Sequence, residues 1–83
     1  MNITAYLNFI QLGENIILTK RFMKSIMYFE IKQTSRDFAL MAVYSLKGSP
    51  ELRNYYLYYT PTREDCEFKL NMLLTAMDKI LNS

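Results

Sequence analysis

The chain has 83 residues, 51% of them hydrophobic and 22% charged, which predicts one folded domain over residues 1–83 and is not typical of a disordered chain. It has no His, one Cys and two Gly, which excludes Ser-His-Asp and Cys-His catalysis, Cys/His zinc sites and glycine-rich nucleotide fingerprints, so we expect no catalytic residue, cofactor or metal. The formal net charge of +2 is too small to indicate nucleic-acid binding by itself.

The first segments have strand composition, rich in Ile, Phe, Tyr and Thr. Apolar and polar residues alternate over residues 3–11, a turn follows at 13–15, and residues 16–22 are apolar again, which predicts a hairpin. The spacing of Ile16, Met23 and Met27 also fits a helix. The strand is the favoured interpretation of residues 13–27, and the helix stays open as the alternative.

Two further hairpins follow along the chain. Residues 25–32 alternate between two faces, residues 33–37 are polar, and residues 38–46 are apolar, which predicts a second hairpin. The sequence Lys47-Gly48-Ser49-Pro50 is typical of a turn, because Gly accepts positive φ and Pro fixes φ for a bend. It leads into a last strand over residues 53–60, so about five strands occupy roughly residues 2–60.

A helix is predicted over roughly residues 61–82. Thr60 and Thr62 offer a side-chain cap around Pro61, and acidic residues follow where the helix dipole favours them. Seven apolar or Cys side chains fall on one stripe at helical spacing: Cys66, Leu70, Leu73, Leu74, Met77, Ile80 and Leu81. The expected fold class is therefore α+β, an antiparallel β-meander of about five strands with one C-terminal α-helix packed on one face.

Aromatic and apolar side chains outside the expected core are the candidates for binding a partner. In a regular strand, Tyr55 and Tyr59 lie on one face and Tyr56 and Tyr58 on the other, so a helix on one face leaves two tyrosines for a partner. On the helix, Phe68 and Met72 point away from the core stripe. The predicted partner-binding residues are Tyr55, Tyr56, Tyr58, Tyr59, Phe68 and Met72. The alternatives are tyrosines that simply expose their hydroxyls and a helix patch partly covered by the side-chain stems of Lys69, Thr75 and Lys79 or by the N-terminal segment.

Self-association is expected because so small a domain, without disulfide or metal, has little stability in reserve. Five short strands leave at least two unpaired edges. Residues 53–60 form the edge best suited to pairing, because they hold no proline and one charge. We therefore expect a homodimer through this edge, with Phe68 and Met72 able to contribute contacts.

A basic surface is the alternative basis for function. Lys20, Arg21 and Lys24 lie close in sequence and, with the tyrosines, suggest stacking on and phosphate contact with single-stranded nucleic acid. No known nucleic-acid-binding motif supports this interpretation, and scattered solvated charges remain the simpler explanation. The single cysteine, Cys66, lies in the predicted core stripe, so an inert buried thiol is favoured over a nucleophile.

The expected location is the reducing cytoplasm. One cysteine cannot form an internal disulfide, no basic segment precedes the first apolar run, and the longest apolar stretch, residues 38–46, is about half of what a membrane span needs. We expect a non-enzymatic protein-binding module that acts stoichiometrically on a larger partner. The Lys, Asn, Ile and Tyr bias suggests a phage or mobile-element inhibitor or adaptor, and a small nucleic-acid-binding protein is the alternative function.

Overall fold

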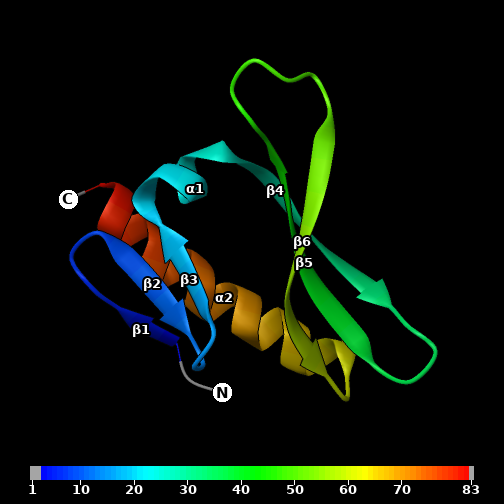
Figure 1. The fold of residues 1–83 in the computed structure, drawn as a ribbon. Helices are drawn as coiled ribbons and strands as arrows, with labels where there is room; N and C mark the ends of the chain where they lie inside the picture. The colour runs from blue at the N-terminus through cyan, green and yellow to red at the C-terminus, as the bar shows by residue number, and fades with distance from the viewer. Residues whose placement is uncertain (1–2, 83) are drawn as a thin grey trace.

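Two three-stranded antiparallel sheets share one long helix (Figure 1). The computed structural model describes residues 3–82. Its elements are β1 (Ile3–Ala5), β2 (Phe9–Leu12), β3 (Ile16–Thr19), α1 (Lys20–Ser25), β4 (Ile26–Gln33), β5 (Phe38–Ser45), β6 (Leu52–Thr60) and α2 (Arg63–Leu81). The first sheet has the order β1-β2-β3 and the second the order β4-β5-β6. The predicted α+β fold with a C-terminal helix is confirmed, with six strands in two sheets where about five in one meander were expected.

The first sheet is a meander of short strands. The apolar alternation predicted for residues 3–11 is present, but the strand is broken at residues 6–8, where the Tyr6 N–H donates to the Phe9 carbonyl oxygen at 2.8 Å and reverses the chain. Gly13 adopts a φ of 63° in the next turn, a conformation that side chains other than glycine rarely adopt. Ile10 and Leu18, opposite one another on β2 and β3, are completely buried.

A six-residue helix, α1, separates the two sheets. The Thr19 hydroxyl accepts a hydrogen bond from the Phe22 N–H at 3.1 Å, so the strand predicted over 16–22 ends at Thr19 and becomes helical. Met23 is buried, and the Phe22 ring packs edge-on against Tyr44 and Tyr55. The helical alternative for residues 13–27 is therefore correct for residues 20–25, and the strand prediction is correct for residues 16–19 and 26–27.

The second sheet is built around β5, its central strand. All five residues from Ala39 to Val43 are buried, although successive side chains of a strand point to opposite faces. Leu40 and Ala42 belong to the core shared with α2, so Ala39, Met41 and Val43 lie on the opposite face. The apolar run predicted for residues 38–46 is thus the centre of a hairpin sheet, as expected.

The long helix α2 begins at a capped N-terminus and buries one stripe. The Thr62 hydroxyl accepts from the Asp65 N–H at 3.1 Å, so Thr62 supplies the expected cap. Leu73 is completely buried, but Leu74 is 44% exposed, so the prediction that Leu74 lies in the core is wrong. Leu74 lies about 80° around the helix from Cys66, at the rim of the stripe.

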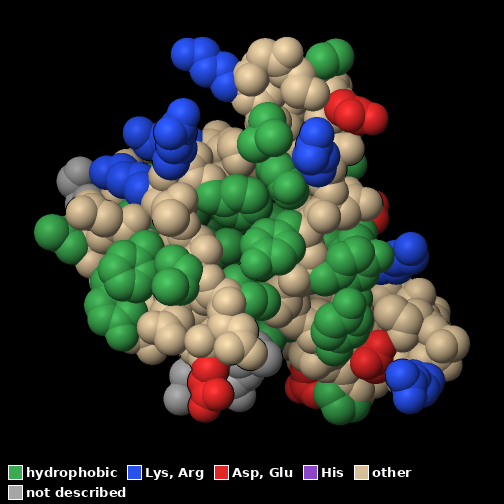
Figure 2. Space-filling view, viewed as in Figure 1, with side chains coloured by type: hydrophobic (Ala, Val, Ile, Leu, Met, Phe, Trp, Pro, Cys, Tyr) green, Lys and Arg blue, Asp and Glu red, His purple; other side chains and the backbone are tan. Residues whose placement is uncertain are grey.

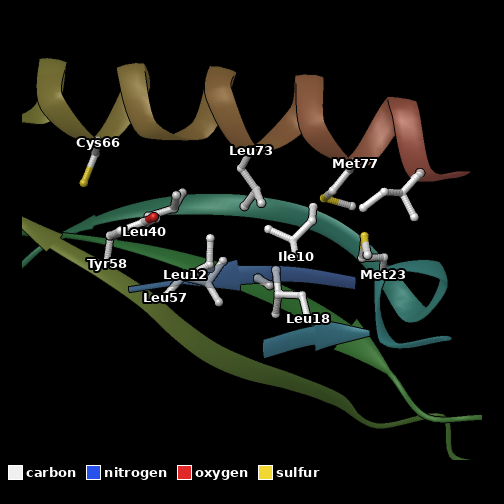
Figure 3. Close-up of a cluster of buried hydrophobic side chains, with 12 residues drawn as sticks. Ile10, Leu12, Leu18, Met23, Leu40, Leu57, Tyr58, Cys66, Leu73 and Met77 are labelled. Carbon is white, nitrogen blue, oxygen red and sulfur yellow. The ribbon is translucent and has the colours of Figure 1, made fainter. Parts of the chain in front are cut away.

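The core lies between α2 and both sheets (Figure 3). Leu73 and Met77 point from α2 toward Ile10 and Leu18 of the first sheet, whereas Cys66 lies over the end that carries Leu40 and Tyr58. Side chains from strands far apart in sequence thus meet under one helix. The helix therefore holds the two sheets together and fixes which sheet face remains outside.

Candidate protein-binding surfaces

A β-bulge at Leu57 decides which tyrosines of β6 point outward. Tyr58 lies opposite Leu40, whereas the next residue of β5, Met41, lies opposite Tyr56, so Leu57 is an extra residue in β6. Leu57 and Tyr58 are both buried in the core, although they are neighbours in sequence. The bulge therefore shifts the alternation of faces by one residue between Tyr56 and Tyr59.

Tyr58 is on the core side and not on the partner side that the regular alternation predicted. Its side chain is 2% exposed, and burial raises the pKa of its phenol above the usual 10.0. Within residues 3–82 its hydroxyl group has no hydrogen-bond partner, and the Lys69 ammonium lies 5.7 Å from the ring centroid. The prediction that Tyr58 contacts a partner is therefore wrong.

The outer face of the second sheet carries the exposed tyrosines. Residues that pair directly across antiparallel strands share a face. By this register the face, here called the tyrosine face, consists of Tyr28, Glu30, Lys32, Ala39, Met41, Val43, Asn54, Tyr56 and Tyr59. Tyr56 and Tyr59 are 36% and 60% exposed and stack with their ring centroids 5.9 Å apart and their planes 8° apart. Such a stack between positions i and i+3 of one strand is a direct consequence of the bulge.

Apolar residues form the floor of the tyrosine face. Met41 is 2% exposed although it points away from α2, so side chains of the two flanking strands cover it. Tyr28, on β4, adds a third exposed ring on this face. No pattern in the sequence indicates Tyr28 as a surface residue, because its place opposite Val43 becomes apparent only from the strand register.

Tyr55 lies on the other face of β6, toward α1. It is opposite Ala42, a core residue, and its ring packs edge-on against Phe22 at 5.7 Å between centroids. Its exposed fraction of 37% nearly equals that of Tyr56 on the tyrosine face. The structure thus joins Tyr56 and Tyr59 in one surface and separates both from Tyr55 and Tyr58.

The edge expected to pair with a second copy is an edge in the structure. In the part of the chain that the structure describes, β6 pairs with β5 alone, and its nine residues contain no proline. The bulge at Leu57 divides this edge into two straight pieces, of which Leu52–Tyr56 is the longer. A β-bulge in an edge strand disfavours unspecific pairing of that edge with other strands. We therefore expect a selective contact at this edge to use side chains of the tyrosine face as well as the backbone.

Phe68 and Met72 form one wall of a groove. They are 63% and 39% exposed, as expected for residues opposite the core stripe, and β1 forms the facing wall. The groove, here called the β1–α2 groove, has a volume of about 520 Å³. It is lined by Ile3, Ala5, Phe68, Asn71, Met72, Thr75, Ala76 and Lys79. The N-terminal segment thus lies beside this patch, as one alternative expected, because β1 flanks Phe68 and Met72. It does not close over them, and both side chains remain exposed.

The three clustered cations lie on α1. Lys20 is half-buried, Arg21 and Lys24 are exposed, and blue side chains gather over α1 in Figure 2. Because α1 packs on the core-side residues Tyr44 and Tyr55, these cations do not share a surface with Tyr56 and Tyr59. Stacking on Tyr56 or Tyr59 and phosphate contact through these cations would therefore fall on different sides of the second sheet, whereas Tyr55 lies on the α1 side.

In residues 3–82, no three Cys, Asp or Glu side chains are placed to hold one metal ion, and neither described helix has the length and apolar character to cross a membrane. Comparisons with protein-family models, with curated proteins and with solved structures return no match.

Proposed function

We propose that this chain is a protein-binding module without catalytic activity of its own, which acts by stoichiometric binding to a larger partner protein through the tyrosine face. The observation that supports this most is the exposed stack of Tyr56 and Tyr59 beside the buried Met41. Rigid rings around an apolar floor offer contact area at little cost in side-chain entropy, and Tyr is enriched in interfaces. An intracellular inhibitor or adaptor of viral or mobile-element type is the kind of protein that we propose.

The edge of β6, beside the tyrosine face, is proposed to pair two copies of the chain. The straight piece of β6 from Leu52 to Tyr56 offers unpaired backbone groups next to the tyrosines. A symmetric contact would bury both edges at once and extend two three-stranded sheets into one. The resulting homodimer would still leave Tyr59, at the far end of β6, near the rim of the contact.

The nucleic-acid alternative has weaker support. It needs aromatic rings and phosphate-binding cations on one surface, and the structure puts Arg21 and Lys24 on α1, on the side of the second sheet opposite Tyr56. Tyr55 alone among the selected tyrosines lies beside α1. Protein binding is therefore the function that the arrangement favours.

A photo-crosslinking amino acid at position 59 tests the proposal in the native cell. We expect one discrete protein adduct, with a mass equal to this chain plus a single partner or plus a second copy. The control places the same amino acid at position 21, on α1, where no protein adduct is expected. Adducts to nucleic acid alone, or equal protein adducts from both positions, would contradict the proposal.

A second measurement separates self-association from partner binding. Light scattering at tens of micromolar should give a dimer for the unmodified chain and a monomer for Tyr56→Lys combined with Tyr59→Lys. Leu74→Lys is the matched control, because Leu74 is similarly exposed but lies on α2. A monomer at millimolar concentration in the unmodified chain would rule out the dimer.

A further inference from the structure

The β1 strand presents an unpaired edge whose hydrogen-bonding groups can be assigned from the ladder. The Tyr6 N–H donates to the Phe9 carbonyl oxygen, and hydrogen-bonded pairs alternate along an antiparallel ladder. Thr4 and Gln11 are therefore the next hydrogen-bonded pair, two residues away. It follows that Ile3 and Ala5 direct their N–H and C=O groups away from β2, toward the free edge.

The neighbouring ladder supports the same assignment. The Lys20 N–H donates to the Asn8 carbonyl oxygen at 3.0 Å, so by alternation Ile10 and Leu12 direct their backbone groups toward β3. These are the residues that lie opposite Ala5 and Ile3 on β1. Both ladders thus leave the backbone groups of Ile3 and Ala5 without a partner in the first sheet.

The same two residues line the β1–α2 groove. Their side chains share the α2 side of the sheet with Ile10 and Leu12, and the facing wall is the flank of α2 that exposes Phe68 and Met72. The groove therefore has an open strand edge on one side and an apolar wall on the other. This combination occurs where an extended peptide adds to a sheet and inserts alternate side chains against a helix.

We propose that the β1–α2 groove binds an extended peptide segment of another protein, which adds as a strand to the edge of β1 and carries a carboxylate that pairs with Lys79. Ile3 and Ala5 would supply the backbone hydrogen bonds, and Phe68 and Met72 would contact the apolar side chains. Lys79 is the one charged side chain among the described residues that line the groove, so a carboxylate complements the groove.

A second copy of this chain is a poorer occupant. Residues 3–5, which would pair across a symmetric β1–β1 contact, contain no Asp or Glu, and the edge strand Leu52–Thr60 carries Arg53 and no acid. The other long edge strand, β4, carries Glu30, but Lys32 lies on the same face and balances its charge. None of these edges would offer a net negative charge to Lys79. The charge in the groove therefore favours a different protein.

This inference names a second surface and rests on the proposed function only in that the chain binds proteins. The tyrosine face belongs to the second sheet, and the groove lies between the first sheet and α2. Variants of one surface should leave the other intact. Failure of the peptide test would leave the crosslinking test at position 59 unaffected.

The test is an NMR titration of the nitrogen-15-labelled full chain with an unlabelled eight-residue peptide that alternates Val and Thr and ends in Asp-Glu. We expect the amide signals of Ile3 and Ala5 to shift most on β1, with smaller shifts at Thr4, whose N–H is already bonded within the sheet. An unchanged spectrum at millimolar peptide, or shifts confined to the tyrosine face, would overturn the proposal.

Two N-methylated versions of the peptide test strand addition directly. Methylating alternate amides in one register blocks the set that faces β1, and methylating the other register leaves that set free. One version should therefore lose binding at least tenfold while the other retains it. Equal binding by both versions would show that no strand is added and would overturn the proposal.

Protein variants test the two remaining contacts. Phe68→Glu should weaken peptide binding about tenfold, and because Phe68 is 63% exposed, the variant should fold. Lys79→Glu should weaken it severalfold, whereas Lys79→Arg should preserve it. Tyr56→Lys combined with Tyr59→Lys should leave binding unchanged. Loss of dimer in light scattering with Phe68→Glu, without loss of peptide binding, would assign the groove to a second copy instead.

Discussion

The Thr60 hydroxyl oxygen lies 3.0 Å from the Sγ of Cys66, in a hydrogen bond that links the end of β6 to the first turns of α2. The same hydroxyl group donates to the Thr62 carbonyl oxygen at 2.7 Å. Thr60 is 7% exposed and Cys66 is fully buried. A buried polar cluster with its groups satisfied therefore fixes the angle at which the helix leaves the sheet.

We expect Cys66 to react slowly with a thiol reagent in the folded protein, because its side chain is completely buried on the side of α2 that faces the sheets. In denaturant the reaction should be fast. Absorbance of the released reporter, followed over time in both conditions, measures the difference. Equal rates would show that Cys66 is accessible in the folded chain.

Leu73→Ala should lower the free energy of unfolding by roughly 2 to 5 kcal/mol, the usual cost of a cavity at a fully buried leucine. Leu74→Ala is the matched control, one residue further along the same helix and 44% exposed. Its cost should stay below about 1 kcal/mol. Thermal melts followed by circular dichroism compare them, and similar losses in both variants would mean that the helix is rotated.

Tyr58→Phe should leave the free energy of unfolding unchanged or raise it by about 1 kcal/mol, since the phenol hydroxyl is buried without a hydrogen-bond partner in residues 3–82. Urea titration of the two proteins measures the change. A loss of more than about 1 kcal/mol would indicate that the hydroxyl group makes a stabilising contact.

The pH dependence of stability offers a separate test of Tyr58. Burial raises the pKa of this phenol above the usual 10.0, so the folded state holds the proton more tightly than the unfolded chain does. Below pH 10 the phenol is protonated in both states and contributes no pH dependence. Above it the unfolded state ionises first, so stability should fall with rising pH. Tyr58→Phe should make that fall less steep, and an identical slope would contradict the shift.

Thr19→Ala should destabilise the domain by about 1 kcal/mol, because the Thr19 hydroxyl caps the first turn of α1 through the Phe22 N–H. Thr19→Ser retains the hydroxyl group and is the control. Urea titrations of both variants provide the comparison. An equal effect of the two substitutions would show that the cap does not act through the hydroxyl group.

Local patterns in the sequence predicted the capped helix and the hairpins, whereas the positions of individual side chains depended on tertiary contacts. Thr62 caps α2 through a local hydrogen bond, which is why the sequence reveals it. The extra residue at Leu57 leaves no trace in a run of tyrosines, so regular alternation placed Tyr58 on the wrong face. Leu74 has the right chemistry for a core residue, but its burial depends on how far each sheet extends beneath the helix.

The point at which the first sheet ends, after Thr19, could not be predicted from local sequence patterns either. Residues 16–22 carry apolar side chains that suit a strand, and the Thr19 cap competes with strand continuation by offering the Phe22 N–H a partner. Burial of Met23 then favours the helix. The candidate tyrosines were found from composition, but their division between two faces needed the register of β5 and β6.

The position of α2 after all six strands affects how the chain is synthesised. Each sheet has three strands and covers its apolar face with residues 63–81, so Ile10 and Leu40 have no shared cover until the ribosome has released those residues. Docking of α2 is then the step that completes the hydrophobic core beneath both sheets. A nascent chain stalled before Arg63 would expose the apolar faces of both sheets. We expect such a chain to bind chaperones and to aggregate readily.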